Sequence, residues 1–178
     1  MAPLPPLSPP LPGRRVLLAS DSMLRPLERL SWPAPFDVTA RCFSGAGLET
    51  VVKKCLALSG SRFDVVVLHA GVNDASGGAS LESDFRRSCD FAARALRARF
   101  SDARVVVSLA CLSASEPVNV KVAVVNRLLR EFALAQGFCL ISNDNIRITD
   151  LTDVVHLNAA GTARIYGSFF NCLCVDAV

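Results

Sequence analysis

Long apolar runs, a strong excess of basic charge and Cys-x-x-Cys pairs are all absent from this sequence of 178 residues. No run approaches the roughly 18 to 20 uninterrupted apolar residues of a membrane-spanning helix, so we expect no membrane span. The formal net charge is only +3, which gives no strong signal for nucleic-acid binding through neutralised phosphates. A small-molecule or lipid substrate is the expected partner, and the oligomeric state stays open.

Cysteine spacing of the kind that holds zinc is also missing, because none of the seven cysteines belongs to a Cys-x-x-Cys pair. The cysteines are odd in number, scattered and mostly embedded in apolar runs. We therefore interpret them as reduced thiols rather than as a disulfide framework. The sequence accordingly predicts no metal site and a reducing compartment.

The first 13 residues, MAPLPPLSPPLPG, form a proline-rich leader that we expect to be disordered, followed by one domain over residues 14–178. Positive charge follows the apolar residues of this leader, which is the reverse of the order in a secretory signal. With neither a signal peptide nor a membrane span, we expect a cytoplasmic protein. A polyproline helix that docks to an SH3-like module is an alternative role for the leader.

Five short apolar runs, rich in β-branched residues, are typical of strands and alternate with longer amphipathic stretches. This alternation predicts an α/β fold with a mostly parallel, five-stranded sheet. The third and fourth runs have the continuous apolar character of strands that are buried on both faces. The predicted strands cover residues 15–19, 36–42, 63–68, 104–109 and 138–141.

Apolar residues at helical spacing predict three helices, over residues 81–100, 119–136 and 159–172. In the second of these, Val122, Val125, Leu129 and Phe132 form one stripe, and Gly137 is placed to end the helix as a C-terminal cap. Helices on both faces of the sheet give a three-layer, flavodoxin-like architecture.

Small and polar residues follow the first three predicted strands, at the edge where parallel sheets bind their ligands. Ser22 follows the first strand, Gly45 the second and Asn73 the third. Because the carboxyl ends of parallel strands lie at the same edge, we expect these loops to converge on one site. Near the other end of the chain, Asp153 precedes His156 by three residues, close enough for its carboxylate to orient the ring.

These residues match the requirements of nucleophilic attack on an acyl carbon. Ser22, at a strand-to-helix turn, is the predicted nucleophile, His156 is the predicted base, and Asp153 orients the base. We expect the backbone amides of Ser22 and Gly45 and the side-chain amide of Asn73 to form the oxyanion hole. Each such donor contributes on the order of 3 kcal/mol. The mechanism needs no cofactor.

Four sequence blocks resemble the ordered Ser, Gly, Asn and His blocks of the SGNH (GDSL-type) hydrolases: SDSM around Ser22, FSGAG around Gly45, GVND around Asn73 and DVVHLN around His156. The resemblance covers nearly all of the chain after the leader. It implies the SGNH hydrolase fold and serine esterase activity through an acyl-enzyme on Ser22. One position departs from the family pattern: Ser20 stands where the family usually has glycine, and its side chain could tighten the turn or narrow the pocket.

A narrower resemblance involves LHAGVND, VNRLLREFALAQGFCLISNDNI and DVVHLNAAGTARI, which are similar to the esterase domain in the first open reading frame of some vertebrate LINE retrotransposons. This resemblance implies hydrolysis of acetyl or other short-chain esters, with lipid esters included, and descent from such an element. It does not define the acyl chain length or the alcohol moiety.

Two other functions fit parts of the same sequence. A non-catalytic binding or interaction module of a retroelement-derived protein would keep the SGNH fold without turnover, and Ser20 is its sequence support. A metal-dependent phosphodiesterase would instead use Asp21, Asp74, Asp153 and His156 as a metal cluster and would lose activity with a chelator.

Several polar groups near the predicted site also have structural interpretations. Ser22 could be only a helix N-cap, and Asp74 a turn or cap residue before the helix over residues 81–100. His69, at the end of a buried strand, is interpreted as a core histidine, and Asp21 as a structural hydrogen-bonding residue. The arginines of that same helix are interpreted as a solvated face, with contact to an anionic membrane or nucleic acid as the alternative.

Overall fold

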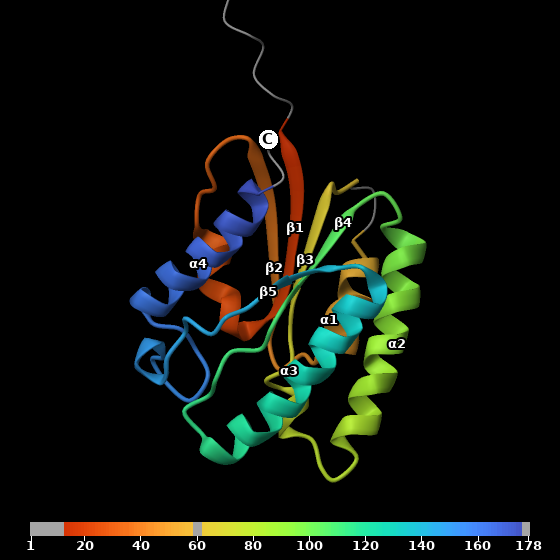
Figure 1. Ribbon diagram of the computed structural model, residues 1–178. Helices are drawn as coiled ribbons and strands as arrows, with labels where there is room; N and C mark the ends of the chain where they lie inside the picture. The colour runs from red at the N-terminus through yellow and green to blue at the C-terminus, as the bar shows by residue number, and fades with distance from the viewer. Residues whose placement is uncertain (1–12, 59–61, 176–178) are drawn as a thin grey trace, which may run out of the picture.

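A sheet of five strands forms the centre of the fold in the computed structural model, which describes residues 13–58 and 62–175 (Figure 1). Apart from Gly13, the predicted leader lies outside the described residues. Each strand overlaps one of the five predicted runs. The strands are β1 (Arg14–Asp21), β2 (Phe36–Phe43), β3 (Val65–His69), β4 (Arg104–Ser108) and β5 (Cys139–Ile141).

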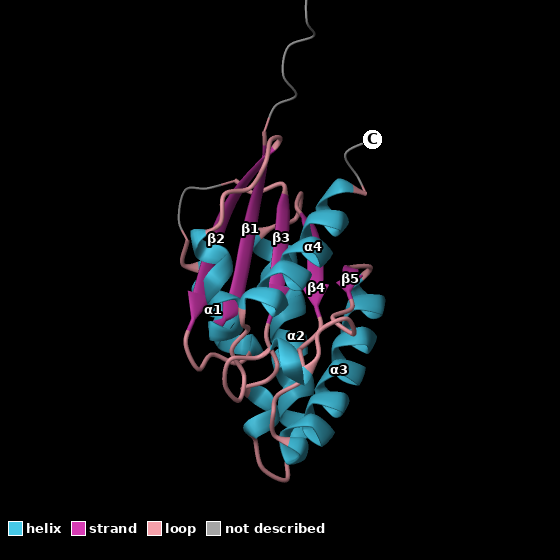
Figure 2. Ribbon diagram, turned by 90° about the vertical axis from the view of Figure 1, so that its left-hand side faces the viewer, coloured by secondary structure: helices cyan, strands magenta, loops and turns pink. Residues whose placement is uncertain are grey.

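The strands run in the order β2-β1-β3-β4-β5, and every neighbouring pair is parallel (Figure 2). This confirms the predicted α/β fold with a five-stranded sheet. The strand order reverses between β1 and β3, and sheets of this order bind ligands beside that reversal, at the carboxyl ends of the strands. Ser20 of β1 is in register with Cys42 of β2 and His69 of β3, so the residues that follow these strands meet at one edge.

Helices cover both faces of the sheet, with α4 on one face and α1, α2 and α3 on the other (Figure 1). The three helices predicted from periodicity correspond to α2, α3 and α4, and η1 follows the first strand at the predicted strand-to-helix turn, whereas α1, η2 and η3 were not predicted. The α-helices are α1 (Leu48–Leu56), α2 (Leu81–Arg99), α3 (Glu116–Gln136) and α4 (Ala159–Cys174). The 3-10 helices are η1 (Ser22–Arg29), η2 (Asp74–Ser76) and η3 (Ile148–Asp150).

The predicted apolar stripe of α3 faces the interior. Val122, Val125, Leu129 and Phe132 are all buried, as their spacing along one face of a helix requires. Gly137 ends the helix with φ of +65°, in the left-handed region that favours glycine. Sequence periodicity therefore determines the buried face of this helix, and Gly137 determines its end.

Two of the five arginines of α2 are paired with acidic groups of the same protein. Arg86 lies 3.0 Å from both Glu82 and Glu131, and Arg87 pairs with Asp84. These pairs favour the interpretation of α2 as a solvated face, and membrane contact stays a prediction. In the part of the chain that the structure describes, no helix has the length and apolar character needed to cross a membrane.

Candidate active site

Ser22 lies at the point where β1 ends and η1 begins. The N-cap of η1 is Asp21, whose Oδ1 accepts a hydrogen bond from the Met23 backbone N–H at 3.0 Å. Ser22 is the first residue of the helix and is partly buried. Because Asp21 supplies the cap, the hydroxyl of Ser22 is not needed for it.

The Ser22 hydroxyl instead contacts a histidine from the far end of the chain. Ser22 Oγ lies 3.2 Å from His156 Nε2, and His156 Nδ1 lies 2.8 Å from Asp153 Oδ2. The structure thus brings the three residues that were predicted as a triad into one hydrogen-bonded chain.

The charge of Asp153 determines which nitrogen of His156 carries a proton. Backbone N–H groups of Val155 and His156, each 2.9 Å from Asp153 Oδ1, and the His156 ring hold the pKa of Asp153 at about 2. An ionised carboxylate only accepts hydrogen bonds, so Nδ1 of His156 is the donor to Asp153. In the neutral ring Nε2 is then free to accept the hydroxyl proton of Ser22, which is the tautomer that a general base needs.

Local contacts hold the segment that carries the imidazole. Leu151 and Leu157 form an antiparallel bridge, and the Thr152 backbone N–H donates to the His156 carbonyl at 2.7 Å. Asn158 follows directly and caps α4, with its side-chain oxygen 3.0 Å from a backbone N–H of the first turn. The base therefore lies on a closed loop that is anchored to a helix.

Gly45 and Asn73 lie on neighbouring loops that are tied together. The backbone of Gly45 has φ of +67°, a conformation that glycine adopts without strain. The Asn73 side-chain amide donates a hydrogen bond to the Ala46 carbonyl at 3.1 Å, which joins the loop after β3 to the loop after β2. An amide nitrogen carries two N–H groups, so the second can donate to a ligand.

Asp74 has a structural role, but at a different helix from the one predicted. Its carboxylate accepts a hydrogen bond from the Leu48 backbone N–H at 3.0 Å and so caps α1 rather than α2. A Cβ added at Gly47 would lie 2.5 Å from Asp74 Oδ1, so this contact requires glycine. Burial raises the pKa of Asp74. Local sequence pointed to the next helix along the chain, whereas the fold places the carboxylate at an earlier one.

Ser20 is fully buried in β1. Its hydroxyl donates to the Asp21 carbonyl at 2.8 Å and lies 3.1 Å from Cys42 Sγ. The side chain therefore contacts the neighbouring strand β2. It lines neither the groove beside η1 and α4 nor the cavity near the start of β4.

Asp21 is also fully buried, and its Oδ2 has no hydrogen-bond partner among the described residues. Burial raises its pKa to about 7, an effect that the Met23 N–H opposes and the charge of Asp74 reinforces, while His156 lowers it. The carboxyl group therefore gains a proton much more readily than an exposed aspartate. Its contact with Met23 agrees with the structural interpretation of this residue.

His69 lies in the core, at the end of β3. It is 1% exposed, and its Nδ1 lies 2.9 Å from Ser108 Oγ. Burial lowers the pKa of His69 to about 4, so the ring is neutral at physiological pH. The interpretation of His69 as a core histidine is confirmed.

A metal centre has no counterpart in the described residues. Within ranges 13–58 and 62–175, no three His, Cys, Asp or Glu side chains are grouped as metal ligands would be. The four acidic and histidine residues considered for a metal cluster are instead divided between a helix cap, a second helix cap and the contact with Ser22. None of the cysteines forms a disulfide bond among the residues that the structure describes.

A groove of about 660 Å³ lies between η1, α4 and the loop that carries His156. Its walls include Pro26 and Leu30 from η1 and its end, Leu157 from the loop, and Ala163 and Tyr166 from α4. No charged side chain is among the described residues that line it. Sequence reasoning did not identify this groove, because its walls come from three separate segments.

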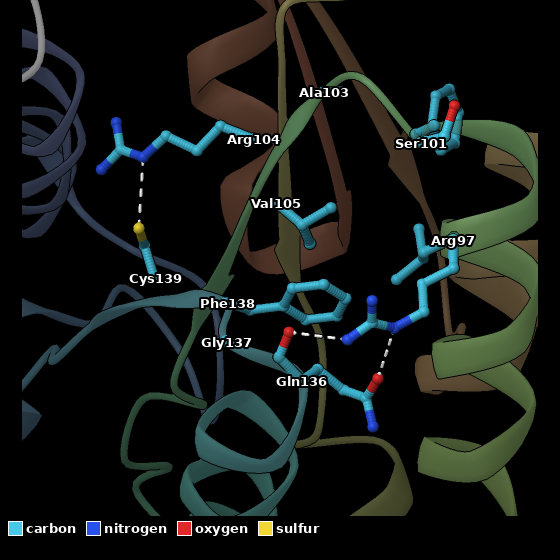
Figure 3. A pocket seen from close by; sticks show the side chains of 11 residues that line it. Arg97, Ser101, Ala103, Arg104, Val105, Gln136, Gly137, Phe138 and Cys139 are labelled. Atoms are coloured by element: carbon cyan, nitrogen blue, oxygen red, sulfur yellow. Dashed lines mark hydrogen bonds between the residues drawn. The ribbon is translucent and has the colours of Figure 1, made fainter.

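A second cavity, of about 310 Å³, lies at the opposite edge of the sheet, near the start of β4 and the ends of α2 and α3 (Figure 3). Arg97 reaches across it and donates to Gln136 Oε1 at 2.7 Å, while Arg104 donates to Cys139 Sγ at 3.2 Å. Both guanidinium groups are thus engaged by the protein. This cavity is not part of the Ser22 site.

Solved structures share this fold. The chain is similar to a GDSL-like lipase from Bacteroides thetaiotaomicron, with a TM-score of 0.75, 15% identity, and coverage of 89% of this chain and 87% of that chain. It is similar to a carbohydrate esterase of family 3 from Talaromyces cellulolyticus, with a TM-score of 0.74, 19% identity, and coverage of 90% of this chain and 96% of that chain. It is also similar to a catalytic mutant of an acetylxylan esterase from Geobacillus stearothermophilus, with a TM-score of 0.69, 12% identity, and coverage of 89% of this chain and 93% of that chain. At these identities the likeness establishes the α/β fold of SGNH hydrolases.

The family follows from the sequence itself. The model of the GDSL-like lipase/acylhydrolase family matches residues 23–164, a region that begins one residue after Ser22. The chain therefore belongs to the GDSL-like lipase/acylhydrolase family, whose members are hydrolases of carboxylic esters. No curated protein matches the chain, and no comparison supports the narrower resemblance to retrotransposon esterase domains.

Proposed function

We propose that this protein is a serine esterase that hydrolyses acetyl or other short-chain acyl esters, including esters of lipids. The main support is the hydrogen-bonded chain from Ser22 through His156 to Asp153, with contacts of 3.2 and 2.8 Å. These three residues have the chemical types and the order of contact that nucleophilic acyl transfer requires. Family membership supports the same reaction class.

The proposed reaction proceeds in two stages. Ser22 Oγ attacks the ester carbonyl carbon while His156 Nε2 takes the hydroxyl proton, and Asp153 stabilises the imidazolium. The bond to the alcohol oxygen then breaks as His156 returns that proton to the leaving alcohol. A water molecule, deprotonated by His156, attacks the acyl-enzyme and releases the acid, which restores Ser22.

The oxyanion hole is proposed to consist of the backbone N–H groups of Ser22 and Gly45 and the side-chain amide of Asn73. The first N–H groups of a helix have no partner within the helix, which suits the Ser22 amide at the start of η1 to this task. The hydrogen bond from Asn73 to Ala46 supports the proposal, because it fixes the amide beside the loop that carries Gly45.

The exposure of the site supports esters with a sizeable alcohol part. The side chains of His156 and Asp153 are 45% and 54% exposed, so the base lies at the surface rather than at the end of a tunnel. Neighbours in fold include an acetylxylan esterase and a lipase, which agree with acyl esters as the substrate class.

The test is hydrolysis of p-nitrophenyl acetate by the purified protein, together with labelling by a fluorophosphonate probe. We expect the wild type to turn over and to be labelled, and Ser22→Ala to lose both. Ser101→Ala, an exposed serine at the opposite edge of the sheet, is the matched control and should retain both. A folded wild type that neither hydrolyses the ester nor takes the label would contradict the proposal and favour a non-catalytic binding module.

A further inference from the structure

We infer that the groove between η1 and α4 binds an aliphatic chain in the alcohol part of the ester. The inference rests on the proposed function, because it places the substrate relative to Ser22 and His156. It goes further by naming which part of the substrate the groove receives and what chemistry that part has.

The position of the groove connects it to the reacting groups. One wall is η1, which begins with Ser22; Pro26 lies four residues further on, about 8 Å along a 3-10 helix. A second wall contains Thr152 and Leu157, which enclose the segment that carries His156. The groove therefore extends away from the Ser22 to His156 contact over a distance that a short alkyl chain can span.

The position of the groove relative to the reacting groups indicates which part of the ester it receives, the acyl part or the alcohol part. Two of the three predicted oxyanion donors, Gly45 and Asn73, precede α1 and η2, and α1 lies on the face of the sheet opposite α4 (Figure 1). His156 precedes α4 and must return its proton to the leaving alcohol. The alcohol oxygen therefore lies on the α4 side of the reacting carbon, which is the side of the groove.

The lining determines the chemistry of the chain. Apolar side chains, including Pro26, Leu30, Leu157 and Tyr166, supply most of the wall, and Leu30 is 40% exposed. Asn158 also lies in the wall, and both its side-chain nitrogen and its side-chain oxygen are hydrogen-bonded to backbone groups. A volume of about 660 Å³ is in the range of sites that bury small ligands. Ser31, Thr152 and Thr162 add hydroxyl groups to the wall, but apolar surface predominates, which favours an aliphatic chain over a sugar.

The kinetic test compares ethyl, butyl and hexyl acetate, which lengthen the alcohol part, with ethyl hexanoate, which lengthens the acyl part. We expect kcat/KM to rise with alcohol length, up to about fourfold for each methylene that becomes fully buried. Ala163→Phe places a ring in the groove and should remove this rise. Ala160→Phe adds the same ring at another exposed position of α4, outside the groove, and should keep the rise.

A binding test does not depend on turnover. Trp32 is the only tryptophan of the chain, and its ring centroid lies 4.6 Å from that of Tyr166 in the groove wall, so its fluorescence should respond to an occupant. We expect Ser22→Ala to show a saturable fluorescence change with hexyl acetate, and the double variant Ser22→Ala with Ala163→Phe to lose it.

The outcomes separate this inference from the proposed function. A rise in kcat/KM with acyl length alone, or with neither part, would overturn the assignment to the alcohol chain, as would an equal effect of both phenylalanine variants. If the wild type hydrolyses none of the esters, the proposed function fails. The fluorescence titration then still decides whether the groove binds an aliphatic chain, and the absence of saturable binding overturns that as well.

Discussion

The buried carboxyl group of Asp21 makes the stability of the fold depend on pH. Its side chain is fully buried, Oδ1 accepts from the Met23 N–H, and its pKa is raised from 3.8 to about 7, mainly by burial. The folded state thus binds this proton more tightly than the unfolded state. The contribution of Asp21 to the free energy of unfolding is fully present below about pH 4 and declines as the pH rises to about 7.

The size of this effect follows from the shift in pKa. A rise of roughly three units corresponds to about 4 kcal/mol of stability lost between pH 4 and pH 7. Asp21→Asn keeps an oxygen that can accept from Met23 and cannot ionise. Relative to the wild type, we expect the variant to gain stability steadily over this range and to be the more stable protein at pH 8.

Urea unfolding at intervals from pH 4.5 to pH 8 measures the difference in free energy between the two proteins. Asp37→Asn, at an exposed position of β2, is the matched control. A difference between wild type and Asp21→Asn that stays constant with pH, within about 0.5 kcal/mol, would refute the reasoning that burial controls the proton on Asp21.

Three further predictions concern the site and its supports. Asp153→Asn should lower kcat by a factor on the order of 10²–10⁴ without loss of the fold, because the base loses the partner that holds its tautomer; kinetics and circular dichroism measure this. Gly45→Ala should destabilise the protein by about 1–2 kcal/mol in urea unfolding and lower kcat/KM, since its φ of +67° strains any Cβ-bearing residue. Ser20→Gly should cost about 0.5–1 kcal/mol of stability and leave the chain-length profile unchanged, because Ser20 is buried and does not line the groove between η1 and α4.

Each of these has a result that contradicts it. An Asp153→Asn enzyme with kcat within threefold of the wild type would show that the carboxylate does not orient the base. Gly78, where an added Cβ also meets open space but φ is not positive, is the control for Gly45, and equal destabilisation of both alanine variants would exclude backbone strain as the cause. A changed substrate profile in Ser20→Gly would mean that Ser20 shapes the pocket after all.

The strands and the longer helices could be predicted because their patterns are local. Val65, Val66 and Val67 are continuous and β-branched, as a strand between two helical layers requires, and the α3 stripe follows the helical period. The contact between Ser22 and His156 was predicted from chemistry and sequence order, although the two residues are 134 positions apart.

Elements that depend on distant partners could not be predicted. The nine-residue α1 is capped by Asp74, which lies 26 residues after Leu48, so the start of this helix has no local signal. Pro26 lies within η1, where proline argues against a continued helix in sequence patterns. The buried state of Asp21 likewise depends on packing that only the folded chain provides.

The span of the Ser22 to His156 contact means that hydrolysis would report on the whole fold. The nucleophile follows the first strand and the base precedes the last helix, so the other four strands of the sheet lie between them in the chain. A protein divided into two pieces between β3 and β4 would therefore regain ester hydrolysis only when the pieces reassemble. Such a pair of fragments would act as a colorimetric reporter of association for any two proteins fused to them.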